Sequence, residues 1–320
     1  MSQQSARRNA VHVFPITVPE PLTPTHAEQQ SVSEFVLQSL AQNGLTPEPG
    51  DVLCLSSKIA ALYEGRTPIL DSVVPSRTSR FLGRLFDKDP RKLELMRQDG
   101  KVAMVIPMRF IAKRRAGRQA VDRLSTDPST RETALSLVER YEFMMAMHGV
   151  IINEAGIDIM NSPIGRISQL PKDPEKTAHD LRIALKKELG FNLPVIITDT
   201  IAPFGRLGTV DVAIGFSGLV PVERKLIAED LFGDLRPGGA NIIVDSIAAI
   251  AGAVMGQTTE MTPATLIRGC EFVAEDPTDY VAGSGMSRLT YPKGSTGLGV
   301  VLTVFVTAWY RLLSLFLPRR

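Results

Sequence analysis

Cysteine is scarce in this chain of 320 residues, and histidine is nearly as rare. Cys54 and Cys270 are the only cysteines, and neither forms a CxxC pair or lies at a zinc-ligand spacing from a histidine. The four histidines are scattered and form no HExxH pair. A disulfide framework and a thiolate zinc site are therefore not expected. The protein is expected in the reducing environment of the cytoplasm. If a metal is bound, oxygen ligands should hold it, which favours Mg²⁺ or Mn²⁺.

An excess of charge is also missing. The chain has 36 basic and 34 acidic residues, a formal net charge of +2, so no overall field indicates a nucleic-acid partner. The first 18 residues lack a continuous apolar segment, which argues against a secretory signal. With 44% apolar residues, the composition is that of an ordinary globular protein with a proper core.

Long apolar runs are absent except at the C-terminus. Residues 298–317 are mostly apolar and would span about 30 Å as a helix, enough to cross a bilayer. Trp309 and Tyr310 favour a membrane interface, and Arg311 could extend its side chain to that interface. A membrane anchor and an amphipathic or core-docking terminal helix both fit this pattern. Residues 283–297, rich in Gly and Ser, are expected to form a flexible linker.

The hydrophobic pattern predicts a mixture of strands and helices. Strands are expected at 11–18, 52–55, 102–108, 148–155, 195–200, 212–215 and 264–268, and helices at 31–40, 131–147, 173–189 and 242–255. The amphipathic helix at 173–189 opens with Asp173-Pro174 and stops at Gly190. The strand, helix and strand between residues 148 and 200 suggest a crossover unit.

Acidic residues follow two of the predicted strands. Asp158 comes after the run that breaks at Gly156, and Asp199 closes the β-branched run that begins at Val195. Acids at the ends of short apolar strands lie where loops build sites over a rigid sheet. Each could also be an ordinary turn or helix-cap residue. Two such acids in similar settings favour the interpretation as a site.

A third segment combines hydroxyl groups with a cation. The strand at 52–55 runs into Ser56-Ser57-Lys58, which can offer backbone N–H groups and an ammonium group to a phosphate. The segment lacks the glycines of a P-loop, so it does not by itself identify a nucleotide site.

Several stretches together resemble the family of coenzyme F420-0:L-glutamate ligases, and they occur in the family's order. They span roughly residues 11–275, which we expect to be one ligase-like domain. The stretches are Gly50-Asp51-Val52, Ser57-Lys58-Ile59, Glu64-Gly65-Arg66, His148-Gly149, Ala155-Gly156-Ile157-Asp158 with Asn161, Leu170-Pro171 with Asp173-Pro174, Asp199-Thr200, Asp211 to Gly215, Asp230 to Gly233, Met255-Gly256-Gln257 and Ile267-Arg268-Gly269.

The resemblance implies a fold and a reaction. The fold would be α+β, with mixed β-sheets and packed helices in two intertwined subdomains, usually in an intimate homodimer; here the C-terminal hydrophobic helix would follow. The enzyme would use GTP and Mg²⁺ or Mn²⁺ to attach L-glutamate through a γ-glutamyl amide bond to coenzyme F420-0 or a related carboxylate. GTP would phosphorylate the carboxylate, and the amine of L-glutamate would displace phosphate from the acyl phosphate. Carboxylates are needed to hold the cations that offset the phosphate charge.

The resemblance also implies roles for individual residues. The metal ligands would be Asp158, Asp199, Thr200 and Gln257. The nucleotide would be held by Ser57, Lys58, Asn161, Met255, Gly256, Thr258, Thr259 and Glu260. Arg206 and Asp211 are added as catalytic candidates for phosphate or substrate contact, because they lie near the site in sequence.

The chain departs from the family pattern in several places. The second lysine that usually follows Ser-Lys-Ile is replaced within Ala60-Ala61-Leu62, and Thr25 to Glu28 stand where Gly-Asp-Asp-Leu is usual. Ile201 to Arg206 replace a Gly-Arg-Pro run, and the hydrophobic tail is no part of the usual enzyme. These departures leave open a non-catalytic, membrane-tethered scaffold or nucleotide-binding protein that reuses the ligase fold. A nucleotide hydrolase is a third reading, although nothing marks a water-activating base.

Overall fold

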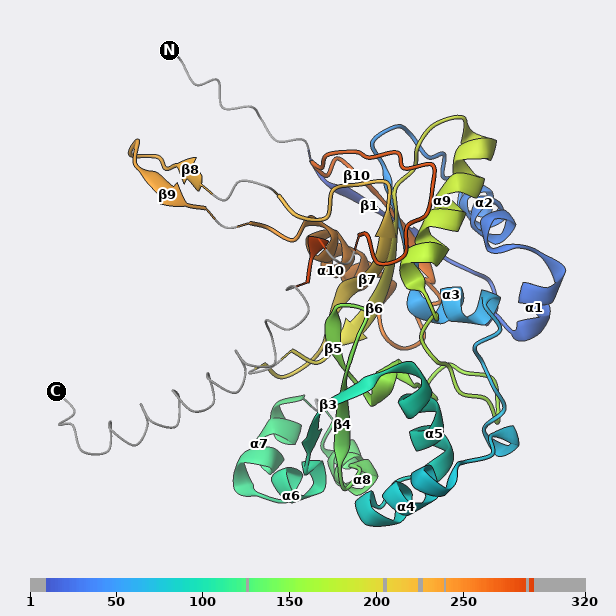
Figure 1. Cartoon of the computed structure of the whole chain (residues 1–320), viewed down its shortest axis with the longest axis vertical. Helices are drawn as coiled ribbons and strands as arrows, with labels where there is room; N and C mark the ends of the chain where they lie inside the picture. The colour runs from blue at the N-terminus through green and yellow to red at the C-terminus, as the bar shows by residue number, and fades with distance from the viewer. Residues whose placement is uncertain are drawn as a thin grey trace.

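The computed structural model describes residues 10–124, 127–203, 206–223, 227–238, 240–285 and 288–290. These residues form an α+β architecture in which helices pack around separate β-sheets (Figure 1). The hydrophobic helix expected at 298–317 and most of the linker expected at 283–297 lie outside the described ranges. Within those ranges, no helix combines the length and the apolar character that crossing a membrane requires.

A five-stranded sheet forms the larger part of the molecule. Its strand order is β1 (His12–Ile16), β10 (Ala264–Arg268), β2 (Val52–Ser56), β6 (Val195–Ile201) and β7 (Val210–Ser217). β2 and β6 run parallel, and the other neighbours are antiparallel. The predicted strands at these positions are confirmed.

The central strands are buried because helices cover both faces of this sheet. Successive side chains of a strand point to opposite faces, so Leu53 and Leu55 join one apolar core while Val52 and Cys54 join the other. Helix α9 (Pro174–Leu189) packs in the first core and helix α10 (Ile243–Met255) in the second. Both helices were predicted. Asp173 caps α9 by accepting a hydrogen bond from the backbone N–H of Lys176 at 3.0 Å.

A second, three-stranded sheet is inserted between α3 (Ser57–Tyr63) and α9. Its order is β3 (Lys101–Ile106), β4 (Glu142–Met147) and β5 (Val150–Asn153), all antiparallel. The helices around it are α4 (Arg77–Phe86), α5 (Pro90–Asp99), α6 (Met108–Ala112), α7 (Arg115–Leu124) and α8 (Pro128–Leu137).

Two predictions for this region are wrong. The helix expected at 131–147 ends at Leu137, and the methionine-rich stretch after it is strand β4. Pairing with β3 on one side and β5 on the other outweighs the helical preference of its methionines. The crossover unit expected between residues 148 and 200 does not form, because β5 and β6 belong to different sheets.

The remaining elements lie at the edges of these layers. α1 (Pro24–Gln29) contacts α3, and α2 (Val32–Gln42) contacts α9. Short 3₁₀ turns occur at Leu70–Ser72 and Glu154–Gly156. A hairpin of β8 (Ile227–Glu229) and β9 (Leu235–Pro237) projects away from the body (Figure 1).

Candidate active site

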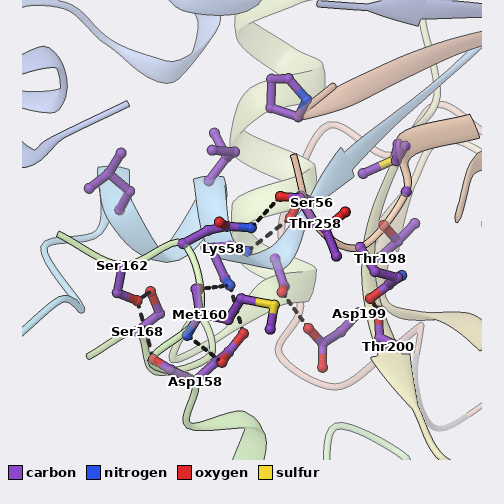
Figure 2. Close-up of a pocket in the computed structure, with 18 of the residues that line it drawn as sticks. Ser56, Lys58, Asp158, Met160, Ser162, Ser168, Thr198, Asp199, Thr200 and Thr258 are labelled. Atoms are coloured by element: carbon purple, nitrogen blue, oxygen red, sulfur yellow. Dashed lines mark hydrogen bonds and ion pairs between the residues drawn. The ribbon is translucent and has the colours of Figure 1, made fainter. Parts of the chain in front are cut away.

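A pocket of about 940 Å³ opens at the end of the parallel strand pair (Figure 2). Ser56 of β2 is paired with Thr198 of β6, and the residues that follow each of them line the pocket. Because β2 and β6 are parallel, their carboxyl ends meet at one edge of the sheet, the usual position of a ligand site in such sheets. The segment after β5 and the loop after α10 close the pocket.

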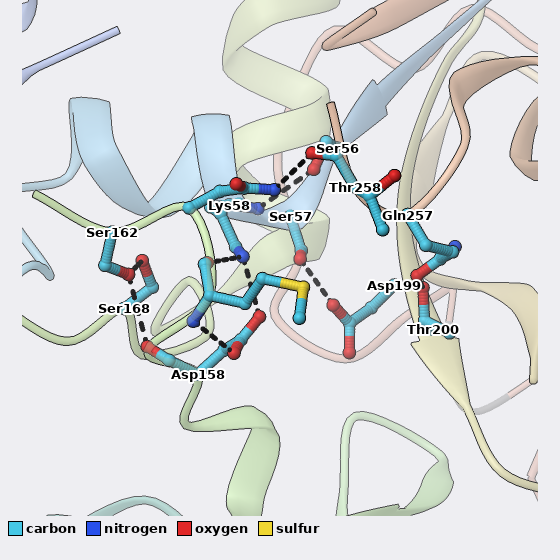
Figure 3. A network of polar contacts seen from close by, with 12 residues as sticks. Ser56, Ser57, Lys58, Asp158, Ser162, Ser168, Asp199, Thr200, Gln257 and Thr258 are labelled. Atoms are coloured by element: carbon cyan, nitrogen blue, oxygen red, sulfur yellow. Dashed lines mark hydrogen bonds and ion pairs between the residues drawn. The ribbon is translucent and has the colours of Figure 1, made fainter. Parts of the chain in front are cut away.

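Two consecutive residues at the start of α3 contact the two acids that the sequence singled out. The hydroxyl of Ser57 donates a hydrogen bond to Oδ1 of Asp199 at 2.5 Å. Nζ of Lys58 lies 2.7 Å from Oδ2 of Asp158 and donates to the carbonyl oxygen of Met160 at 2.5 Å (Figures 2 and 3). The predicted residues Ser57, Lys58, Asp158 and Asp199 therefore lie in one pocket.

A second polar cluster surrounds Asp211. Thr200 and Asp211 are paired across β6 and β7, and the Thr200 hydroxyl donates to Oδ1 of Asp211 at 2.7 Å. The amide nitrogen of Gln257 donates to the same oxygen at 3.2 Å, and its amide oxygen lies 3.1 Å from the Thr200 hydroxyl. Gly252 of α10 faces this acid, and a Cβ there would lie 2.5 Å from Cγ of Asp211. The absence of a side chain at Gly252 thus makes room for the carboxylate.

Burial perturbs both carboxylates of this region. Desolvation by burial raises the pKa of Asp199 to about 7. The hydrogen bond from Ser57 lowers this pKa, and the nearby charge of Asp211 raises it. Burial also raises the pKa of Asp211. Four acids line the pocket, namely Asp158, Asp199, Asp211 and Glu260. Lys58 is the only basic side chain among the described residues of this lining.

This donor set fits a hard divalent cation. Carboxylate, hydroxyl and amide oxygens are the ligands that Mg²⁺ and Mn²⁺ prefer, and a cation would offset the excess of negative charge. Thr198 lines the same pocket, and its buried hydroxyl has no hydrogen-bond partner within the described residues. In the described part of the chain, no three His, Cys, Asp or Glu side chains converge as a ready metal cluster. An ion here would need the Thr and Gln oxygens, water or a bound ligand to complete its coordination.

The loop after α10 is held by its own polar contacts. Oε2 of Glu260 accepts a hydrogen bond from the backbone N–H of Thr258 at 2.7 Å, which lowers the pKa of this carboxyl. Gly256 has a φ of +70°, and a Cβ there would lie 2.3 Å from Cδ of Glu260, so only glycine fits. The amide of Asn161, itself at a φ of +55°, donates to the carbonyl of Thr258 at 2.6 Å. The predicted nucleotide residues Met255, Gly256, Thr258, Thr259 and Glu260 all line the pocket.

Comparison with known proteins now identifies the family. The family model described as F420-0:Gamma-glutamyl ligase matches residues 22–269. The chain belongs to this family. Its match contains every predicted site residue from Ser57 to Glu260 and excludes the C-terminal tail.

Individual members of the ligase family are similar along most of their length. The protein of Methanopyrus kandleri named coenzyme F420:L-glutamate ligase is 30% identical over 222 residues, which cover 69% of this chain and 76% of the relative. Proteins of the same name from Methanothermobacter thermautotrophicus and Methanocaldococcus jannaschii are 28% and 27% identical over 238 and 242 residues. These matches cover 74% and 76% of this chain and 82% of each relative. The resemblance expected from the motifs is confirmed, and the chain is an enzyme of the ligase class.

One feature of this ligase-family pocket differs from what the sequence suggested, and a second agrees with it. Arg206 lies exposed on the loop between β6 and β7 and is not part of the pocket lining. Leu62, which belongs to the segment where a lysine was expected from the resemblance, is 5% exposed and lines the pocket on the same face of α3 as Lys58. The pocket wall therefore carries an apolar group one helical turn from its ammonium.

Sequence reasoning missed several lining residues. Thr198 lines the pocket next to Asp199, at the point where the pairing of β6 with β7 shifts register. Ser162 and Ser168 join their hydroxyls across the far wall at 2.8 Å. No local sequence signal marks these residues, since a strand irregularity and a contact between two loops depend on the assembled fold.

Proposed function

We propose that this ligase uses GTP and a divalent cation to form an amide bond between a carboxylate of coenzyme F420-0, or of a related acceptor, and the amine of L-glutamate. The bond is a γ-glutamyl bond when the acceptor carboxylate is the γ-carboxylate of a glutamate already attached. The observation that carries the proposal is the convergence of the family's acids and its Ser57-Lys58 pair, from segments far apart in sequence, on one pocket. The names of the similar proteins, coenzyme F420:L-glutamate ligase, support the choice of substrates.

The reaction makes one amide bond at the expense of one phosphoanhydride. A carboxylate oxygen of the acceptor attacks the γ-phosphorus of GTP, so that GDP leaves and an acyl phosphate remains. The amine nitrogen of L-glutamate then attacks the acyl carbon, loses a proton and expels phosphate. Both substrates and GTP are anionic, so their approach to a pocket with four acids and one base requires added positive charge.

The proposed roles follow from where each side chain lies. Asp158, Asp199, Thr200 and Gln257 would hold Mg²⁺ or Mn²⁺, which when bound neutralises phosphate charge in the transition state. Ser57, Lys58, Asn161 and the loop from Met255 to Glu260 would bind the nucleotide. Asp211 accepts hydrogen bonds from Thr200 and Gln257 through one oxygen. We therefore propose that Asp211 holds those two side chains in the orientation that metal binding requires.

The proposal is tested with the full chain, F420-0, L-glutamate, GTP and Mn²⁺, with the cofactor analysed by mass spectrometry. We expect a gain of glutamyl residues that depends on metal and is lost in Asp199→Asn. Protein that binds GTP and Mn²⁺ without forming product would point to another carboxylate acceptor. Consumption of GTP without an acceptor would favour a hydrolase, and absence of any nucleotide binding would favour the non-catalytic scaffold.

We further propose that the protein is a homodimer. The tip of the β8–β9 hairpin supports this, because Leu231 is 97% exposed and Phe232 is 93% exposed on an element that projects from the body (Figure 1). Large apolar side chains in such a position are typical of protein interfaces. Membrane contact through residues 298–317 stays a prediction about residues outside the described ranges.

A further inference from the structure

The ammonium group of Lys58 is bound by groups of the protein itself. It contacts Oδ2 of Asp158 at 2.7 Å and the carbonyl of Met160 at 2.5 Å, which uses two of its three donors (Figure 2). Asp158 is equally engaged, because its Oδ1 accepts a hydrogen bond from the backbone N–H of Met160 at 2.8 Å. The only base of the described lining is therefore neutralised by an acid of the same lining.

This ion pair is accessible and easily exchanged. The side chain of Lys58 is 29% exposed and that of Asp158 is 47% exposed. Partly exposed pairs of this kind contribute at most about 1 kcal/mol, because water and salt screen them. Neither the lysine nor the aspartate is locked in place by burial, so each can take another partner at small cost.

Asp158 cannot serve Lys58 and a divalent cation equally well. A cation bound to Oδ2 would displace the ammonium from that oxygen and repel it. The released ammonium would remain at the start of α3 beside Ser57, and Asp158 is the only acid among its hydrogen-bond and ion-pair partners in the described residues. Asp199 interacts with Lys58 through its charge, but its hydrogen bond is the one it accepts from Ser57. A phosphate group is the ligand whose charge would then suit it.

We propose that Lys58 and a divalent cation compete for Asp158, so that cation binding releases Lys58 to the phosphates of the nucleotide. The inference rests on the proposed function for the identities of the cation and the nucleotide. It makes the two binding events positively coupled, and the coupling is reciprocal by thermodynamic linkage. Lys58 thus opposes metal binding while it is paired with Asp158, and it binds the nucleotide once the metal has released it.

The first test measures Mn²⁺ affinity without nucleotide by calorimetry. Lys58→Met should bind Mn²⁺ about 5-fold more tightly than the wild type, since removing the competing pair is worth up to about 1 kcal/mol. Lys187→Met is the matched control, because Lys187 is exposed on α9 and lies outside the pocket lining. Equal or weaker Mn²⁺ binding by Lys58→Met, relative to that control, would overturn the competition.

The second test measures GTP binding in the presence of a chelator. Asp158→Asn should bind metal-free GTP more tightly than the wild type, because it frees Lys58. Loss of the negative charge of Asp158 would by itself also strengthen GTP binding. The double variant Lys58→Met with Asp158→Asn therefore distinguishes this charge effect from the release of Lys58. The competition requires that most of the gain disappears in the double variant, and a gain that persists would refute it.

These outcomes separate the inference from the proposed function. Product formation from F420-0 together with an unchanged Mn²⁺ affinity in Lys58→Met would overturn the competition and leave the ligase assignment intact. The expected shifts in a protein that fails to modify F420-0 would support the competition and overturn the choice of acceptor. If neither the wild type nor Lys58→Met bound Mn²⁺, both the competition and the metal-dependent ligase assignment would be refuted.

Discussion

Replacement of Gly252 by alanine is expected to displace the side chain of Asp211 and so to disturb the pocket that Asp211 lines. The added Cβ would lie 2.5 Å from Cγ, 2.7 Å from Cβ and 2.7 Å from Oδ2 of Asp211. Alanine in a helix interior is better than glycine by about 0.5–1 kcal/mol, but overpacking of this kind costs about 1–3 kcal/mol. Displacing Asp211 also strains its hydrogen bonds to Thr200 and Gln257, each worth about 1.5–3 kcal/mol if the carboxyl is charged.

The net expectation for Gly252→Ala is a loss of about 1–3 kcal/mol in the free energy of unfolding, together with weaker Mn²⁺ binding and lower ligase activity. Urea denaturation and calorimetry measure these quantities. Ala253→Gly is the matched control, because Ala253 is exposed on the same helix and its replacement costs about 1 kcal/mol through helix propensity alone. That control should keep its activity per folded molecule. A Gly252→Ala protein that is as stable and as active as the wild type would show that the position of Asp211 does not matter.

Four further outcomes follow from the geometry. Asp199→Asn should lower ligase turnover by at least about 100-fold while circular dichroism shows an intact fold; undiminished turnover would remove Asp199 from the metal site. Burial lowers the pKa of His148 from 6.5, so the unfolded chain takes up the proton first. The stability that neutral His148 contributes is therefore complete above pH 6.5, and it is lost as the pH falls from 6.5 toward the lower folded-state pKa. The variant His148→Gln should flatten this part of the stability–pH curve. Arg182→Met should destabilise the protein by about 3 kcal/mol in urea titrations, since the side chain is 0% exposed and hydrogen-bonds Ser217 at 2.9 Å and Asp276 at 2.7 Å; a change below 1 kcal/mol would contradict a structural role. Serine at both Leu231 and Phe232 should convert the proposed dimer to a monomer in light scattering, whereas an unchanged mass would place the interface elsewhere.

Local patterns were a good guide where a single segment determines its own structure. Helix α9 was predicted closely, because its Asp173 cap, its apolar stripe and the glycine at Gly190, with a φ of +80°, all lie within one stretch. Strands β2 and β6 were recognised as strands from their aliphatic runs. Strand β4 was mistaken for a helix, because its structure depends on pairing with β3 and β5 rather than on its own residues.

The candidate site shows the same division. Sequence patterns alone singled out Asp158, Asp199 and the Ser57-Lys58 pair, and the order of motifs indicated the ligase family that the comparisons confirmed. Only the tertiary structure decided that Ser57 meets Asp199 across 142 residues of sequence and that Lys58 meets Asp158 across 100. It also decided that Asp211 belongs to the pocket while Arg206 lies outside it. The physical reason is that residue types and motif order are properties of the chain itself, whereas these contacts depend on the assembled fold. The parallel pairing of β2 with β6 brings Ser57 beside Asp199, and the segment after β5 brings Asp158 to Lys58.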